Sequence, residues 1–329
     1  MTEKKSTPTK PVGNPAHIAL LRDHFGERLQ ENVLMSNYTT ARIGGKVDGL
    51  LIVTSALELE EAARFLWKSD IPFYLVGSGS NILVPDNGIR GVVIINHARL
   101  VKIDTHTSPP TVFAESGANI GSITRQVALR GFSGMEWAAN IPGTLGGAVY
   151  GNAGANASDL NTSLMLADIL HRENGNEQWT GDRLQYGYRT SWLKRNPDQA
   201  VVLSARLKLA PSTIEKVQAK MEAFSEKRKS TQPTGASMGS MFKNPEGDFA
   251  GRLIDEAGLR GTRFGSAEIS QAHGNFFINQ GGATASDFWQ LIQLAQKTVK
   301  KKFGVDLQLE VELLGDWKTI QHTPGMEQK

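Results

Sequence analysis

Apolar residues near the start of the chain follow helical spacing and then give way to short strand-like runs. The spacing predicts an amphipathic helix over residues 17–32. A glycine-containing loop then leads into an apolar strand, residues 57–68 return to helical periodicity, and 72–76 form a short apolar run. This strand–helix–strand order predicts a mixed α/β unit at the start of the chain.

The pattern changes after residue 91, where short β-rich runs dominate up to about residue 209. One helix is predicted over residues 120–130, and a glycine-rich stretch follows it. Ligands are commonly held by loops on a rigid scaffold. We therefore predict that this middle region is an α+β unit that holds a ligand through its loops.

The last third of the chain alternates helical and strand-like patterns. Helices are predicted over residues 211–231, 249–257 and 285–303, and the alternating segment 307–315 predicts a closing strand. We therefore expect an α+β protein with a small C-terminal substrate domain. The predicted boundaries are a disordered leader at 1–16, units at 17–90, 91–210 and 211–315, and a tail at 316–329.

Composition excludes several classes of function. The chain has no cysteine, which excludes disulfides, thiolate metal sites and a cysteine nucleophile, and its seven scattered histidines predict no metal site. The net charge of +3 fits a small anionic substrate slightly better than a neutral one. No nucleic-acid-binding signature and no bilayer-spanning apolar segment occur. With a polar N-terminus that does not resemble a signal peptide, a cytoplasmic location is the default expectation.

Two glycine clusters are the strongest local signals. The first, GSGSN at residues 77–81, follows an apolar run and offers consecutive N–H groups of the kind that bind a diphosphate, although a plain tight turn would look the same. The second places five glycines between Gly143 and Gly154, among apolar residues that suggest an ordered loop. Each glycine costs roughly 0.5–1 kcal/mol of folding entropy. A large, flat, anionic ligand against this backbone would explain the cluster.

These loops carry a family resemblance. GSGSNILV and GMEWAANIPGTLGGAVYGNAGA resemble the FAD-binding module of vanillyl-alcohol-oxidase-type flavoproteins. YGYRTS, TQPTGASMGSMFKNP and LEVELLG resemble the UDP-N-acetylenolpyruvoylglucosamine reductase (MurB) family, in its shorter type II form, from about residue 32 to 315. The resemblance implies a two-lobed, PCMH-type FAD module followed by an α+β substrate domain. It also implies FAD held by Gly77, Ser78, Gly79, Ser80, Asn81, Ile82, Gly143, Thr144, Gly146 and Gly147.

The family's reaction belongs to bacterial cell-wall (peptidoglycan) precursor synthesis. By resemblance, NADPH reduces FAD, and flavin N5 then passes hydride to UDP-N-acetylglucosamine enolpyruvate, giving UDP-N-acetylmuramate. Arg189 matches the catalytic arginine, Ser240 the proton donor and Glu310 the catalytic glutamate. Substrate contacts are expected from Tyr188, Lys243 and Asn244. Thr190 stands where part of the family has Asp, and Leu309 where some members have Pro.

The three candidate catalytic residues also have ordinary structural interpretations. Arg189 could be a surface arginine, Ser240 a turn serine and Glu310 an exposed strand carboxylate. Arg228, Arg252 and Arg263 are candidates for the UDP diphosphate, although each fits a solvated charge better, and His273 fits a turn or core histidine. Two other functions remain open from the residues. One is another flavin-dependent oxidase or dehydrogenase of the same superfold, and the other is a non-catalytic flavin or nucleotide-sugar binding protein. We expect a monomer.

Overall fold

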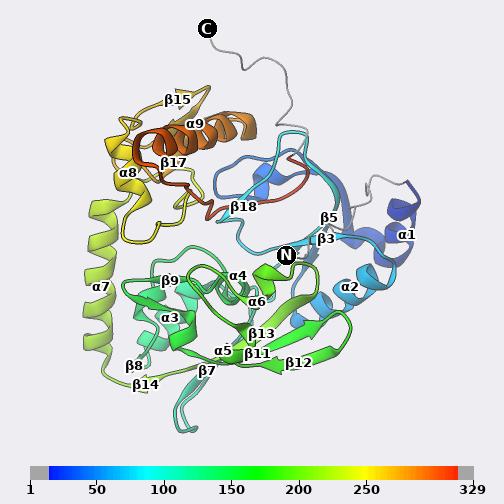
Figure 1. The fold of residues 1–329 in the computed structure, drawn as a ribbon. Helices are drawn as coiled ribbons and strands as arrows, with labels where there is room; N and C mark the ends of the chain where they lie inside the picture. Colours follow the sequence, from blue (N-terminus) through cyan, green and yellow to red (C-terminus); the bar gives the residue numbers. More distant parts are fainter. Residues whose placement is uncertain (1–14, 318–329) are drawn as a thin grey trace, which may run out of the picture.

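The computed structural model describes residues 15–317, so most of the predicted leader and most of the predicted tail lie outside the described residues. The last two residues of the predicted leader, 15 and 16, are instead helical and begin α1 (Pro15–Phe25). Figure 1 shows two sheet-containing lobes and a third, largely helical lobe, with the long helix α7 (Ile214–Thr231) running from the second lobe to the third. Between residues 15 and 317, no helix is both long enough and apolar enough to cross a bilayer.

The first lobe is a four-stranded sheet with two helices. Its strands lie in the order β1-β2-β5-β3, with β2, β5 and β3 parallel and β1 antiparallel to β2. Helix α2 begins after Ser55, whose hydroxyl accepts a hydrogen bond from Glu58 N at 3.2 Å. The bounds are α1 Pro15–Phe25, β1 Leu29–Leu34, β2 Lys46–Val53, α2 Ala56–Lys68, β3 Phe73–Val76, β4 Ile82–Leu83 and β5 Ile89–Asn96.

The prediction of one helix over residues 17–32 is wrong in its second half. The helix ends at Phe25, Gly26 adopts a positive φ of 54°, and residues 29–34 form strand β1 with alternating exposure. Leu29 lies four residues after Phe25, a spacing that fits helical periodicity and therefore extended the predicted helix too far. Its side chain packs against the same core from the inward face of the strand.

The second lobe is a five-stranded antiparallel sheet in the order β12-β11-β13-β7-β6. Helices α3 and α4 bury Ile123 and Val149 in the core that includes Trp179. The bounds are β6 Val101–Asp104, β7 Thr111–Glu115, α3 Ile120–Ala128, β8 Phe132–Ser133, α4 Leu145–Gly151, β9 Gly154–Ala155, β10 Ser158–Asp159, β11 Leu164–His171, β12 Gly175–Trp179, α5 Gly181–Leu184, α6 Trp192–Arg195, β13 Ala200–Lys208 and β14 Ala210–Pro211.

The third lobe packs helices α8 and α9 against a small antiparallel sheet, β15-β16-β17. Helix α9 has the predicted bounds and begins with a capping box between Thr284 and Asp287. The bounds are α8 Ala250–Glu256, β15 Arg263–Phe264, β16 Ala267–Ile269, β17 Phe277–Asn279, α9 Ala285–Phe303 and β18 Glu312–Leu313.

The predicted closing strand over 307–315 is wrong in extent, although its two faces are as expected. Strand β18 covers only Glu312–Leu313 and pairs in parallel with β4 of the first lobe. The preceding residues instead pair with the loop at 241–243, through a bridge between Phe242 and Leu309. The segment changes partner because it crosses from one lobe to another, which interrupts a regular ladder.

A buried carboxylate joins the first two lobes. Glu115, at the end of β7 in the second lobe, accepts hydrogen bonds from Ala56 N at 2.9 Å and Leu100 N at 3.0 Å. Ala56 N lies at the N-terminus of α2 in the first lobe, where a negative charge is favoured. The two lobes that flank the glycine clusters are therefore fixed relative to each other.

We predict that Glu115→Ala lowers the free energy of unfolding by about 3 kcal/mol, because two backbone N–H groups lose a charged acceptor. Urea unfolding of the flavin-loaded protein measures this effect. The control is Glu173→Ala, which removes an exposed carboxylate. If both variants stay within about 0.5 kcal/mol of wild type, Glu115 does not join the lobes.

Candidate active site

The two glycine clusters meet in space. A Cβ added to Gly77 would lie 2.4 Å from Thr144 Oγ1, and Ser80 Oγ donates a hydrogen bond to Pro142 O at 3.3 Å. One cluster belongs to the first lobe and the other to the second. Their contact forms one continuous backbone surface between the lobes.

The loop at 77–81 presents unpaired backbone N–H groups. Gly79 has a positive φ of 61°, and a Cβ there would lie 1.9 Å from Tyr38 O. Thr40 N anchors the loop by donating to Gly79 O at 3.1 Å. Within residues 15–317, the N–H groups of Ser78, Gly79 and Ser80 donate to no protein acceptor. Consecutive free N–H groups of this kind form a site for a diphosphate.

The second cluster is open on one side and packed on the other. Gly143 has a φ of 128°, and only Ser80 Oγ lies within 4 Å of its Cβ position. Gly147 likewise has only the Thr144 hydroxyl nearby, at 3.7 Å. Gly146 faces the protein, because its Cβ would lie 2.9 Å from Ser116 Cβ. The open glycines suit a flat ring laid against the backbone, so the residues present fit a flavin dinucleotide.

A cavity of about 310 Å³ adjoins Ser78. It is lined by Gly117, by Asn119 at the N-terminus of α3, and by Arg99. None of these three residues was predicted from the sequence as part of the site. Asn119 could have been predicted, because an Asn directly before a predicted helix indicates a capped helix N-terminus, which favours phosphate binding.

Asn81 and Ile82 contact the closing segment at residues 310–312. The Asn81 side chain donates to Glu310 O at 3.1 Å, and Asn81 O accepts from Glu312 N at 3.0 Å. Ile82 is paired with Glu312 in the β4–β18 ladder. Both residues therefore connect the glycine loop to the third lobe.

Arg189 lies in a tight turn between Gly187 and Thr190, which bridge each other. Its φ of +54° is left-handed, a conformation that costs a non-glycine residue roughly 1–2 kcal/mol. Its guanidinium donates from Nε to Glu310 Oε1 at 2.9 Å and from Nη2 to Gly154 O at 2.7 Å. The Thr190 side chain takes no part in these bonds, so the support of Arg189 comes from Glu310 and the β9–β10 hairpin.

Glu310 is the point at which all three lobes meet. Its N–H donates to Met241 O of the third lobe at 2.9 Å, its carbonyl accepts from Asn81 of the first, and its carboxylate pairs with Arg189 of the second. Burial raises the pKa of Glu310, and Arg189 opposes this rise without cancelling it. The backbone hydrogen bonds of this segment to the loop at 241–243 use Glu310 N and Gln308 O, so Leu309 in place of Pro leaves the arrangement intact.

Ser240 lies next to Met241, the backbone partner of Glu310, and bridges Phe276. Its half-buried hydroxyl has no protein hydrogen-bond partner between residues 15 and 317. The structure therefore brings Arg189 and Glu310 into direct contact, with Ser240 on the adjoining loop. A hydroxyl without a protein partner is available to a ligand.

The predicted substrate contacts differ from one another. Tyr188 is 56% exposed, and the Arg189 guanidinium lies 5.4 Å from its ring centroid. Lys243 is half-buried, and burial is the main cause of its lowered pKa. Asn244 Oδ1 accepts from Ala250 N at 3.1 Å, so its carbonyl is engaged at the start of α8. Tyr188 and Lys243 are left better placed for a ligand than Asn244.

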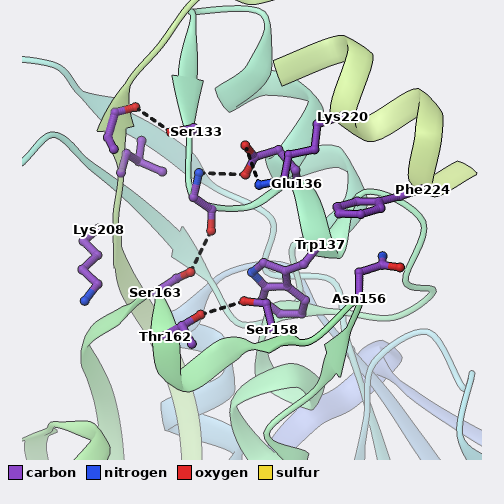
Figure 2. A pocket seen from close by; sticks show the side chains of 13 residues that line it. Ser133, Glu136, Trp137, Asn156, Ser158, Thr162, Ser163, Lys208, Lys220 and Phe224 are labelled. Carbon is purple, nitrogen blue, oxygen red and sulfur yellow. Dashed lines mark hydrogen bonds and ion pairs between the residues drawn. The ribbon is translucent and has the colours of Figure 1, made fainter. Parts of the chain in front are cut away.

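A larger cavity of about 430 Å³ lies between α7 and the second lobe, as Figure 2 shows. Glu136 accepts from Gly134 N at 2.8 Å and pairs with Lys220 at 3.4 Å. The hydroxyls of Ser158 and Thr162 hydrogen-bond to each other at 3.0 Å. Many of its polar groups are thus satisfied by the protein, in contrast to the N–H groups of the glycine loop.

Comparisons with known proteins match this geometry. The pattern of the UDP-N-acetylenolpyruvoylglucosamine reductase C-terminal domain matches residues 231–314, and an FAD binding domain pattern matches residues 47–172. UDP-N-acetylenolpyruvoylglucosamine reductases from Bacillus velezensis and Bacillus subtilis are each 40% identical over 301 residues, covering 91% of this chain and 98% of theirs. The chain belongs to the UDP-N-acetylenolpyruvoylglucosamine reductase family.

A solved structure agrees with this assignment. The crystal structure of the reductase (MurB) from Thermus caldophilus has a TM-score of 0.75 and 34% identity, and the match covers 87% of this chain and 98% of that one. The predicted fold class is confirmed: a two-lobed FAD-binding module is followed by a C-terminal domain. The chain is an FAD-dependent oxidoreductase of peptidoglycan precursor synthesis.

We predict that Gly79→Ala abolishes or strongly reduces FAD binding, because the new Cβ would collide with Tyr38 O and displace the loop. The ratio of flavin to protein absorbance in the purified variant measures the loss. Gly247→Ala is the matched control, since Gly247 also has a positive φ, of 74°, but no atom lies within 4 Å of its Cβ position. A folded Gly79→Ala protein with full flavin content would contradict the assignment.

Proposed function

We propose that the enzyme uses NADPH to reduce UDP-N-acetylglucosamine enolpyruvate to UDP-N-acetylmuramate. The observation that carries this proposal is the meeting of Arg189, Glu310 and the Ser240 loop beside the glycine-lined surface. The loop at 77–81 and the glycine backbone from Gly143 to Gly147 would hold FAD, which would supply the hydride-transfer chemistry between NADPH and the enolpyruvyl double bond. Both substrates would use the same cleft in turn.

Arg189 would stabilise the negative charge that spreads into the substrate carboxylate. A guanidinium keeps its charge at every physiological pH, and its planar fork can bind a carboxylate through two hydrogen bonds. Here Nε and one terminal nitrogen are already fixed by Glu310 and Gly154. The remaining N–H groups are held in a defined direction, so little reorganisation is needed as the charge develops.

Ser240 would deliver the proton that completes the reduction. A hydroxyl is a weak acid, but the carbanion-like enolate is basic enough to take its proton. Glu310, whose pKa is raised by burial, would hold Arg189 in its left-handed turn and share charge or a proton with the developing enol. We propose Arg189, Ser240 and Glu310 as the catalytic residues on this basis.

Arg228 is the best of the three candidate arginines for the substrate diphosphate. Arg252 pairs with Asp248 and Glu256, and Arg263 pairs with Glu268. Among the described residues, Arg228 has no carboxylate partner; it is half-buried and donates only to Asn140 O. Burial lowers the pKa of Arg228, which reflects a charge without a counter-ion. An anionic ligand would supply that counter-ion.

We also propose the domain arrangement expected from the sequence, with residues 17–90 and 91–210 as the FAD lobes and 211–315 as the substrate domain. A monomer suffices for this site, because its residues all come from one chain. The use of NADPH and a nucleotide sugar supports a cytoplasmic reaction.

We predict that Ser240→Ala slows reoxidation of the reduced flavin by the UDP-sugar at least about 100-fold, through loss of the proton donor. Reduction of the flavin by NADPH should keep its wild-type rate. Stopped-flow absorbance of the two half-reactions measures both rates, with Ser237→Ala on the same loop as control. Equal reoxidation rates in Ser240→Ala and wild type would remove Ser240 from the mechanism.

We predict that Arg228→Met raises the KM for the UDP-sugar about 10-fold or more, because a buried cation can no longer meet the diphosphate. Arg252→Met, which removes an arginine already paired with its own carboxylates, should change this KM less than about 2-fold. Steady-state kinetics at saturating NADPH gives both values. Similar KM values for the two variants would rule out the Arg228 assignment.

A further inference from the structure

Glu310 belongs to a cluster of five charged side chains. Glu310 pairs with Arg189, and Glu312, two residues further along the same extended segment, pairs with Lys194. The fifth, Lys243, lies within electrostatic range of Lys194, Glu310 and Glu312. Among the described residues, Lys243 forms no ion pair with a carboxylate. Three cations thus face two carboxylates, and the cation left over is Lys243.

The Lys194–Glu312 pair is fixed from both sides. Lys194 lies in α6, whose first residues are set by the fully buried Ser191. The Ser191 hydroxyl donates to Tyr150 O at 2.6 Å and accepts from Lys194 N at 3.2 Å. Glu312 is held by its own N–H, which donates to Asn81 O at 3.0 Å. Both side chains are partly buried, with exposures of 17% for Lys194 and 33% for Glu312.

We propose that Lys194 is a positioning residue that holds the Glu312 carboxylate away from Lys243, which leaves the Lys243 ammonium free to bind an anionic group of the substrate. The inference rests on the proposed function, because it assumes that the anionic UDP-sugar binds at this site. It assigns a role to a residue other than Arg189, Ser240 and Glu310. Lys194 acts through Glu312 and not by contact with the substrate or the flavin.

The charges around Lys243 support this arrangement. Burial lowers the pKa of Lys243 and Lys194 lowers it further, whereas Glu312 and Glu310 raise it. Glu312 therefore already attracts Lys243, even while it is paired with Lys194. Without Lys194, the Glu312 carboxylate would be left to attract Lys243, which has no ion-pair partner among the described residues.

The remaining groups near the pair do not replace Lys194. Burial raises the pKa of Tyr150 to about 12, with Glu312 and Asp198 adding to the rise, so the phenol stays neutral. Arg189 is engaged with Glu310 and Gly154. The partition of carboxylates among cations at this site thus depends on Lys194.

The test is a rescue experiment. Lys194→Met keeps the side-chain length and removes the charge, and it should raise the KM for the UDP-sugar about 5- to 10-fold with a smaller change in kcat. Adding Glu312→Gln removes the competing carboxylate, so the double variant should return to within about 2-fold of the wild-type KM. Lys194→Arg, which keeps the charge, should behave like wild type.

Two outcomes overturn the inference. A double variant as impaired as Lys194→Met would show that Lys194 acts through packing, and a Lys194→Met variant with wild-type KM would show that Glu312 does not reach Lys243. Flavin content and the rate of flavin reduction by NADPH, measured on the same samples, report whether each variant is folded. Failure of the proposed function is distinguishable, because wild type itself would then not reoxidise its flavin with the UDP-sugar.

Discussion

The ion pair between Arg189 and Glu310 joins parts of the chain that lie more than a hundred residues apart, and the site depends on it. Glu310 receives a backbone bond from the third lobe, a side-chain bond from the first and the guanidinium of the second. Arg189 must adopt a left-handed backbone to reach it. A strained residue persists only where its surroundings fix it, and here the fixing contacts come from all three lobes.

The same constraint explains why the last residues of the third lobe return to the first. Residues 307–313 pass along the loop at 241–243, directly after Ser240 in the sequence, and then pair with β4 directly after the glycine loop. The unpaired N–H groups of Ser78 to Ser80, the proposed proton donor and the proposed catalytic carboxylate are thus placed by one continuous run of backbone hydrogen bonds. These hydrogen bonds fix the position of the glycine loop relative to Ser240 and Glu310.

Much of the fold could be predicted from sequence because the signals were local, whereas the candidate residues Arg189, Ser240 and Glu310 followed from the family resemblance of their motifs. Helix α9 could be predicted from the short-range periodicity of its apolar residues. The glycine loops could be predicted because they use backbone conformations that only glycine adopts easily. What failed depended on distant contacts. Leu29 fits either a helix or a strand until the neighbouring β2 is present, and the closing segment changes partner at the lobe boundary. The roles of Lys194 and Glu312 were not visible, since two charges about 120 positions apart carry no shared pattern.

The visible absorption spectrum of the purified protein under anaerobic conditions tests the central claim most directly. We predict bound oxidised flavin, bleached by NADPH and restored by UDP-N-acetylglucosamine enolpyruvate in stoichiometric amount. A protein that binds no flavin, or one whose bleached flavin the UDP-sugar does not restore, would contradict the claim that the glycine surface and the Arg189–Glu310 pair form one active site.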